Sequence, residues 1–552
     1  MLNLRWRAFA IALAINAAAS ASHAGDSSVD ASIFDGQSVE KISLAEAIKM
    51  SLSNNLEARF DRVGVRIQRS RVRFEAGAFD PVFSMNLGTE SIRRPENSNI
   101  FSSSQGILQQ ETNLANQDLT NAIRTQQGLP PIDRNDIRSG TADTIFDQQN
   151  NRGSANIIGR TPWGMRYGFF AEANRLRNTF SGDQREILPD YQTSVGIQIA
   201  QPLLKDFGPA AALAPLRISR IEQKIAVLNW RQRVMSGVQA VMSTYYDMIF
   251  GVADLQVRRD AIAADTKLVQ QNQRRLELGF MSPFDVEQAR AQVSLDKEQF
   301  LTAKNFLNER QFALKRLILD EFKRGDTRLF LPADSPRLQA PKLDRSALLA
   351  EAFARRYDYQ EALLDAEAQD VRLRFARNQA LPQLDLIATY SLNGLRDSFG
   401  ASFDQAAQGR TPEWTVGLNV RVPLGNVQGR ANLDVAKAQK EQAVIKIKQI
   451  ELTVGVDVDT VISRIETNRQ RVDTARNTSA LNQEAVRIAY RRLEEGQISS
   501  FDIIEQQRRL YDARSRELAS QAELNKAITQ LWLVTGTILE KTGISFEPEP
   551  KR

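Results

Sequence analysis

The side chains best able to do chemistry in this 552-residue chain are carboxylates, because other reactive groups are almost absent. There is no cysteine, which excludes disulfides, thiolate zinc sites, iron–sulfur ligands and a cysteine nucleophile. The one imidazole, His23, cannot build a multi-histidine metal site. No acidic pair lies in a glycine-rich or aromatic-rich pocket motif, which disfavours a carboxylate-pair hydrolase. The sequence therefore predicts that the chain is not an enzyme and needs no cofactor or metal.

Two aspartates, Asp285 and Asp502, occupy the last position in two copies of one sequence motif. Residues 274–285 (RRLELGFMSPFD) return 217 residues later as residues 491–502 (RRLEEGQISSFD), and eight of the twelve positions are identical. In each copy the glycine suits the C-terminal end of a helix, the serine can cap the next helix, and the aspartate falls in its first turn. Both segments are therefore expected to be helix–helix reversals.

Long helices must position these two reversals. Proline-free stretches allow helices over about 212–277 and 430–494, each roughly 100 Å long at 1.5 Å per residue. Helices of that length cannot fit inside a compact domain, so they must pair side by side. After each reversal, positions seven residues apart form a mainly apolar seam of the coiled-coil kind. These positions are Val286, Val293, Phe300, Leu307 and Leu314, then Ile503, Leu510, Glu517, Leu524 and Leu531.

Strand patterns precede each long helix. Val195–Leu203 and Val416–Leu424 both alternate apolar with polar or small residues and end in Pro-Leu. We expect Val82–Ile92 to accompany the first of these strands and Leu384–Leu392 the second. The aromatic residues gathered in these regions are typical of strands at membrane interfaces. A soluble β-layer with ordinary aromatic packing is the alternative.

The first strand region carries a long insert. Residues of about 93–151 are polar, with several Gln and Asn pairs, and are expected to form a large loop or a disordered segment. Two further strand-like runs follow, Ser154–Gly159 and Met165–Asn174. Whether these runs join the other strands stays open at this level.

The whole chain reads as an export signal followed by two repeats of one plan. Residues 1–24 carry Arg5 and Arg7, then an apolar run, then the small residues Ser22 and Ala24, as a secretory signal does. Cleavage would remove His23 and two arginines, so the net charge would fall from +6 to +4. The remaining charges alternate in sign without a basic block, so nucleic-acid binding is not expected. The predicted repeats are 25–340, with strands in about 80–203 and a helical hairpin in 210–320, and 341–552, with strands in about 383–424 and a hairpin in 428–540.

This constellation resembles the TolC family of outer-membrane efflux factors. The resemblance lies in the two reversal motifs, in the strand-to-helix joins at Val195–Leu203 and Val416–Leu424, and in the Ala-Glu-Ala openings at Ala45 and Ala350. It implies a mainly α fold with β strands, two structural repeats per chain, and a homotrimer. The three chains would share one outer-membrane β-barrel in contact with lipid and one long antiparallel α-helical coiled-coil barrel across the periplasm of a Gram-negative cell. The alternative is a periplasmic coiled-coil adaptor or scaffold protein without a membrane barrel.

The resemblance also implies roles for the reversals and for partner proteins. Asp502, Glu505 and Asp285 would form the periplasmic gate, where three-fold symmetry turns one carboxylate into a ring that attracts cations. A plain helix N-terminal charge is the alternative for the two aspartates. Positions that lock the gate in the best-known members are occupied here by Leu493 and Ile498, which puts those locking bonds in doubt. The adaptor-docking tips would include Gly279, Ser282, Gly496 and Ser499, with turn geometry alone as the alternative.

A periplasmic adaptor (membrane fusion protein) and an inner-membrane pump of the RND, ABC or MFS class are the implied partners. The chain would be the passive conduit of an efflux or type I secretion system, and its cargo stays open.

Overall fold

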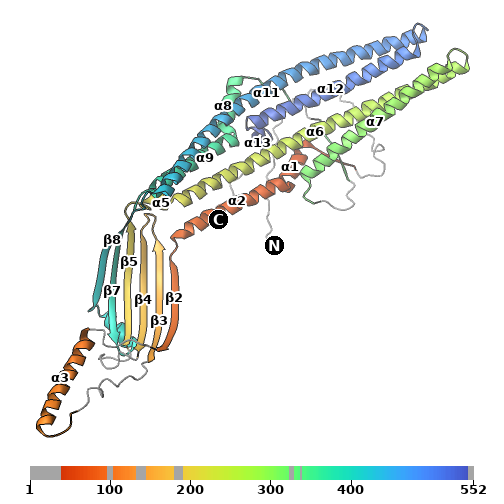
Figure 1. The fold of residues 1–552 in the computed structure, drawn as a ribbon. Coiled ribbons are helices and arrows are strands. Elements are labelled where there is room, and N and C mark those ends of the chain that lie inside the picture. The colour runs from red at the N-terminus through yellow and green to blue at the C-terminus, as the bar shows by residue number, and fades with distance from the viewer. Residues whose placement is uncertain are drawn as a thin grey trace. The chain divides into compact units, whose positions relative to one another are not determined.

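The computed structural model describes residues 39–95, 104–131, 145–178, 190–321, 328–335 and 338–544. The predicted signal peptide, residues 1–24, lies outside the described residues. The described chain is mainly helical and has one large sheet (Figure 1). A second, two-stranded sheet pairs β1 (Val39–Ile42) with β6 (Leu329–Pro332). It divides into two compact units, and each unit takes segments from both of the predicted repeats.

The helical unit comprises the described residues within Met1–Val72, Arg217–Asp370 and Lys437–Arg552. Its two main features are helical hairpins, the first made by α6 (Ala214–Glu277) and α7 (Pro283–Ile318) and the second by α11 (Val427–Glu494) and α12 (Ser500–Val534). The predicted helices over 212–277 and 430–494 agree with α6 and α11 to within a few residues. The shorter elements are β1 (Val39–Ile42), α1 (Leu44–Asn54), α2 (Leu56–Ala76), β6 (Leu329–Pro332), α8 (Arg345–Arg355), α9 (Tyr357–Gln379) and α13 (Ile538–Lys541).

The predicted heptad seams are the buried sides of α7 and α12. Val286, Leu307 and Leu314 are buried on α7, as are Ile503, Leu510, Leu524 and Leu531 on α12. The small residues three positions further on, such as Ala289 and Ala527, are buried as well, so neighbouring helices approach closely. The main core of the unit gathers α1, α6, α7 and the parallel pair β1–β6 around Tyr245 and Phe330, both fully buried.

The sheet unit comprises Arg73–Leu216 and Val371–Ala436. Its sheet has six strands in the order β2-β3-β4-β5-β7-β8, and every neighbouring pair is antiparallel (Figure 1). The strands are β2 (Val82–Pro95), β3 (Ile145–Arg160), β4 (Arg166–Asn178), β5 (Asp190–Pro202), β7 (Gln383–Arg396) and β8 (Pro412–Arg421). The unit also contains α3 (Ser104–Gln126) and the short helices η2 (Gly77–Phe79), α5 (Pro209–Ala212) and α10 (Phe399–Ala407). The open question about residues 154–174 is thereby answered, because both runs are central strands of this sheet.

The expected large loop over residues 93–151 is wrong in part. β2 continues to Pro95, β3 begins at Ile145, and α3 (Ser104–Gln126) lies between them. Glutamine is a fair helix former and residues 104–126 contain no proline, so a polar composition did not prevent a helix. The Gln-Asn run at 148–151 is a strand because it pairs on both sides, with residues 89–92 of β2 and with the end of β4.

Among the described residues, none of the helices combines the length and the apolar character needed to cross a bilayer.

Candidate functional site

The first reversal connects α6 to α7 through a glycine and a serine cap. Gly279 has a φ of +78°, the left-handed conformation that ends helices and that glycine adopts without strain. The Ser282 hydroxyl and backbone N–H donate to the Asp285 carboxylate at 2.7 and 3.3 Å, and the Asp285 N–H donates to the Ser282 Oγ at 3.4 Å. This reciprocal capping box satisfies free donors at the start of α7.

The second reversal repeats this geometry between α11 and α12. Gly496 has a φ of +72°. Ser499 donates to Asp502 at 2.9 Å from its backbone N–H and at 2.7 Å from its hydroxyl. Hydrogen bonds from the Ser499 hydroxyl and then from its N–H hold the pKa of Asp502 below its usual value. The caps predicted from the motif are therefore confirmed, and Asp502 is anionic and held in place by its cap.

Glu505 lies one turn after Asp502 and is neutralised locally. Its carboxylate accepts hydrogen bonds from Arg509 at 2.9 Å and from Arg508 at 2.7 Å. The bond from Arg509, with help from Arg508, lowers the pKa of Glu505 against the opposing effect of burial. Both arginines lie on α12, so within one chain the acidic surface near the second tip is interleaved with positive charge.

Leu493 and Ile498 are packed between the two hairpins. Leu493 is buried in a cluster with Leu268 of α6 and Ile503 of α12, and Ile498 packs against the same cluster. Residues of all four long helices contribute to it. Leu493 and Ile498 therefore help to hold the two hairpins together through apolar contact.

The first tip also exposes apolar side chains that were not predicted as site residues. Leu278, Phe280 and Phe284 are 70%, 81% and 72% exposed. The corresponding second tip carries Phe501, which is 52% exposed. A signal was available in the sequence, because Phe280 lies in the predicted turn itself and Phe284 directly after it. Large exposed apolar groups at a helix reversal are typical of contact surfaces.

A buried carboxyl pair joins α6 to α7 between the two hairpins. Asp265 and Asp296 are 3% and 6% exposed, and their carboxyl groups hydrogen-bond to each other. Burial, followed by this contact, raises the pKa of Asp265 to about 8. Gln292 donates to Asp296 at 3.0 Å. Two neighbouring carboxyls can share a site only if one of them keeps its proton, so this pair holds a proton at neutral pH.

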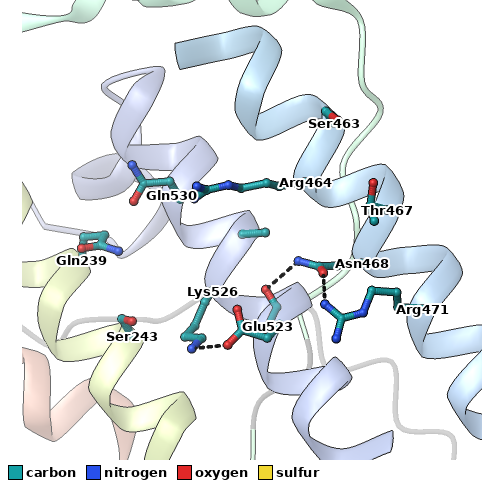
Figure 2. A pocket seen from close by; sticks show the side chains of 11 residues that line it. Gln239, Ser243, Ser463, Arg464, Thr467, Asn468, Arg471, Glu523, Lys526 and Gln530 are labelled. Carbon is teal, nitrogen blue, oxygen red and sulfur yellow. Dashed lines mark hydrogen bonds and ion pairs between the residues drawn. The ribbon is translucent and has the colours of Figure 1, made fainter. Parts of the chain in front are cut away.

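A polar cavity of about 510 Å³ lies between α6, α11 and α12 (Figure 2). Lys526 is paired there with Glu523 at 2.5 Å and with Asp247 at 2.8 Å. Asn468 donates to the Glu523 carbonyl at 3.4 Å, and Arg471 to the Asn468 amide oxygen at 3.4 Å. The lining is polar, with hydroxyl, amide and charged side chains from all three helices.

The sheet has one exposed apolar face. The pairing register of the strands places one apolar residue from each strand in a single row across the sheet, and all six of these side chains are exposed. The row is Phe83, Ile157, Phe169, Ile197, Tyr390 and Trp414. The opposite face carries mostly polar or small residues, such as Asn156, Gln198 and Thr389. Four aromatic residues, Phe83, Phe169, Tyr390 and Trp414, thus meet in one row, whereas Phe170 lies on the opposite face and Trp163 in the β3–β4 turn.

The described residues contain no group of three or more histidine, cysteine or acidic side chains that could hold a metal ion.

A sequence model of the outer membrane efflux protein family matches residues 159–318 and 348–537, which together make up more than half of the chain. The matched ranges include both helix reversals and five of the six long strands in whole or in part.

Individual proteins of known sequence or structure are also similar to this chain. The outer membrane protein TolC of Escherichia coli (strain K12) is 24% identical over 304 residues, covering 52% of this chain and 58% of TolC. The match therefore spans little more than half the length of that relative. Among solved structures, CusC has a TM-score of 0.61 at 14% identity, covering 90% of this chain and 92% of CusC. The outer membrane channel CmeC of Campylobacter jejuni has a TM-score of 0.60 at 14% identity, covering 91% and 90%. These structures share the fold.

Proposed function

The chain belongs to the outer membrane efflux protein family, and we propose that three copies of it form a passive export conduit. Membership places the chain in the outer membrane. In the proposal, the six-stranded sheets of three chains close one shared barrel in the membrane, and the helical hairpins of the three chains form one tunnel in the periplasm. The conduit performs no chemistry, so an inner-membrane pump of the RND, ABC or MFS class supplies the energy and selects the cargo.

The exposed apolar row across the sheet carries this proposal. Trp414 is 72% exposed and Phe83 64% exposed, at opposite edges of the same face. At about 25 cal/mol per Å², several large side chains left in water on one face cost on the order of 10 kcal/mol, which contact with lipid would remove. A polar opposite face suits a water-filled lumen.

Cell fractionation and heating tests separate this conduit from an adaptor or scaffold. The expected result is a trimer in the outer-membrane fraction that survives in detergent until it is heated. A soluble monomer in the periplasmic fraction would refute the conduit and support the adaptor alternative.

We propose that the two tips dock the periplasmic adaptor. Gly279, Ser282, Gly496 and Ser499 set the shape of the tips, and Phe280 with its apolar neighbours adds contact area. The double substitution of Phe280→Ala with Phe284→Ala is expected to reduce adaptor co-purification after crosslinking at least several-fold. Phe312→Ala is the matched control, because Phe312 is also exposed on α7, at 62%, but lies about eight helical turns from the tip. Equal recovery of the adaptor with both variants would remove the tips from the docking surface.

We propose that Asp502, with Glu505 and Asp285, sets the charge of the periplasmic gate. Three copies of Asp502 would place three anionic carboxylates around one axis. Asp502→Ala with Glu505→Ala is expected to lower the cation-over-anion permeability ratio in single-channel recordings. Asp473→Ala, at an exposed carboxylate far from the tip on α11, is the control. An unchanged permeability ratio in the double variant would refute this role.

A further inference from the structure

The hairpin β3–β4 adds two strands to the middle of the sheet, and this addition fixes the size of any barrel that the chain can build. β3 pairs with β2 over fourteen residue pairs, from Val82↔Ile158 to Pro95↔Ile145. β4 pairs with β5 over eleven pairs, from Arg166↔Ala200 to Leu176↔Asp190. The hairpin therefore separates β2 from β5 along nearly their whole length, rather than lying beside a finished sheet.

The two edge strands of the sheet, β2 and β8, run in directions that allow them to pair between neighbouring copies. Because all five neighbouring pairs are antiparallel, β2 and β8 run in opposite directions. β8 of one copy can therefore pair antiparallel with β2 of the next by rotation alone, and a ring of copies closes without a mismatch. All ten residues of β8 are exposed, and in the part of the chain that the structure describes no strand pairs with its outer edge or with that of β2. Such edges are templates for pairing.

The side-chain pattern of both edges places the same face outward. The registered pairs put Met85 and Leu87 of β2 on the face that also carries Val416 and Leu418 of β8. These four side chains are between 58% and 75% exposed. Pairing that matches odd-numbered residues of β2 with even-numbered residues of β8 would continue the apolar face from one copy to the next. A shift by one residue would turn one strand's apolar side chains into the lumen.

We infer that the barrel shared by three copies has eighteen strands, with β3 and β4 of every chain as wall strands. The inference rests on the proposed trimer and deepens it. Barrels of sixteen to eighteen strands leave an aqueous channel, whereas eight strands are filled by their own side chains. The membrane part of this conduit is then an open pore lined by the polar sheet face, and the narrowest point lies elsewhere along the tunnel.

Site-directed crosslinking tests the place of the hairpin, and a chain without cysteine makes every introduced pair unambiguous. In outer membranes, Met85→Cys with Ala155→Cys should crosslink within one chain with a short bifunctional reagent, because β3 lies beside β2. Met85→Cys with Val195→Cys should not, because β3 and β4 lie between them. The reverse outcome would mean that β2 pairs with β5 in a smaller barrel and would overturn the inference.

A second pair tests the joint between copies. Met85→Cys with Leu418→Cys should give covalent dimers and trimers, because both side chains lie near the joint on the outer face. Ser84→Cys with Leu418→Cys, on opposite faces, should give far fewer. Electron cryomicroscopy of the trimer then counts the strands directly. A trimer with twelve wall strands refutes this inference and leaves the conduit intact, whereas the absence of a trimer refutes the proposed function itself.

Discussion

Replacing Asp265 with asparagine should remove most of the pH dependence that the buried carboxyl pair imposes on folding. Asparagine has nearly the same shape, can donate a hydrogen bond to Asp296, and cannot ionise. In the native protein, burial and the neighbouring Asp296 raise the pKa of Asp265 from 3.8 to about 8. In the unfolded chain the same group should titrate near its ordinary value.

The sign and size of the effect follow from these two pKa values. Between pH 4 and pH 8 the native state holds a proton that the unfolded state has released, so the free energy of unfolding falls as the pH rises through this window. At about 1.4 kcal/mol per pH unit, the loss is at most about 5–6 kcal/mol at pH 8 and on the order of 3 kcal/mol once local rearrangement lets water reach the pair. Asp265→Asn avoids this loss.

Thermal unfolding of the detergent-solubilised protein from pH 4 to pH 9 measures the effect. The unfolding temperatures of Asp265→Asn and wild type should agree near pH 4 and diverge by a few degrees at pH 8–9, with the variant more stable. Asp473→Asn, at an exposed carboxylate on α11, should follow the wild type throughout. A constant difference between Asp265→Asn and wild type at every pH would show that Asp265 does not hold a proton and would refute the reasoning.

Three further changes test the helical unit by thermal unfolding. Gly496→Ala places a side chain on a residue in the left-handed conformation, so it should lower the free energy of unfolding by about 1–2 kcal/mol. The control is Gly455→Ala, within α11, where the Cβ position has open space. This control should raise the free energy of unfolding by about 0.5–1 kcal/mol. Destabilisation by both would contradict the assigned conformations. Ser499→Ala removes the cap of α12 and should cost about 1 kcal/mol, and Ser499→Asp should recover most of it; equal losses would argue against capping. Tyr245→Phe removes a buried hydroxyl that donates to the Ile42 carbonyl at 3.0 Å and should cost about 1–3 kcal/mol; an unchanged unfolding temperature would show that this hydroxyl is not needed.

The tip motif could be predicted from the sequence because its signals are local. Three local features specify α6, α7, α11 and α12 with their caps, and none of them depends on the tertiary environment. They are a glycine at a helix end, a serine three residues before an aspartate, and proline-free flanks. The gate and docking roles of Asp502, Glu505 and the tip residues are not local properties. They stay proposals, because they depend on neighbouring chains and partner proteins.

The sheet could be predicted only in part. Alternation of apolar and polar residues marked β5 and β8, strand patterns marked most of β2 and β7, and strand-like runs marked parts of β3 and β4. The start of β3 was missed, because a strand that pairs on both sides can be built from polar residues. Asn150 of β3 is buried, and its side-chain amide nitrogen donates to Glu90 of β2 at 3.2 Å, so this partner lies on a neighbouring strand. No window of sequence around residue 150 contains that partner.

The sequence by itself determined the elements that local chemistry governs: two long helical hairpins, their reversals, and a chain without cysteine and with a single histidine. The tertiary structure decided which elements come together. It placed β3 and β4 inside the sheet, brought Asp265 and Asp296 into one buried pair across two helices, and packed Leu493 and Ile498 between the hairpins. The physical reason is that strand order, shared protons and apolar contacts depend on distances between residues far apart in the chain, which local propensities and spacing do not encode.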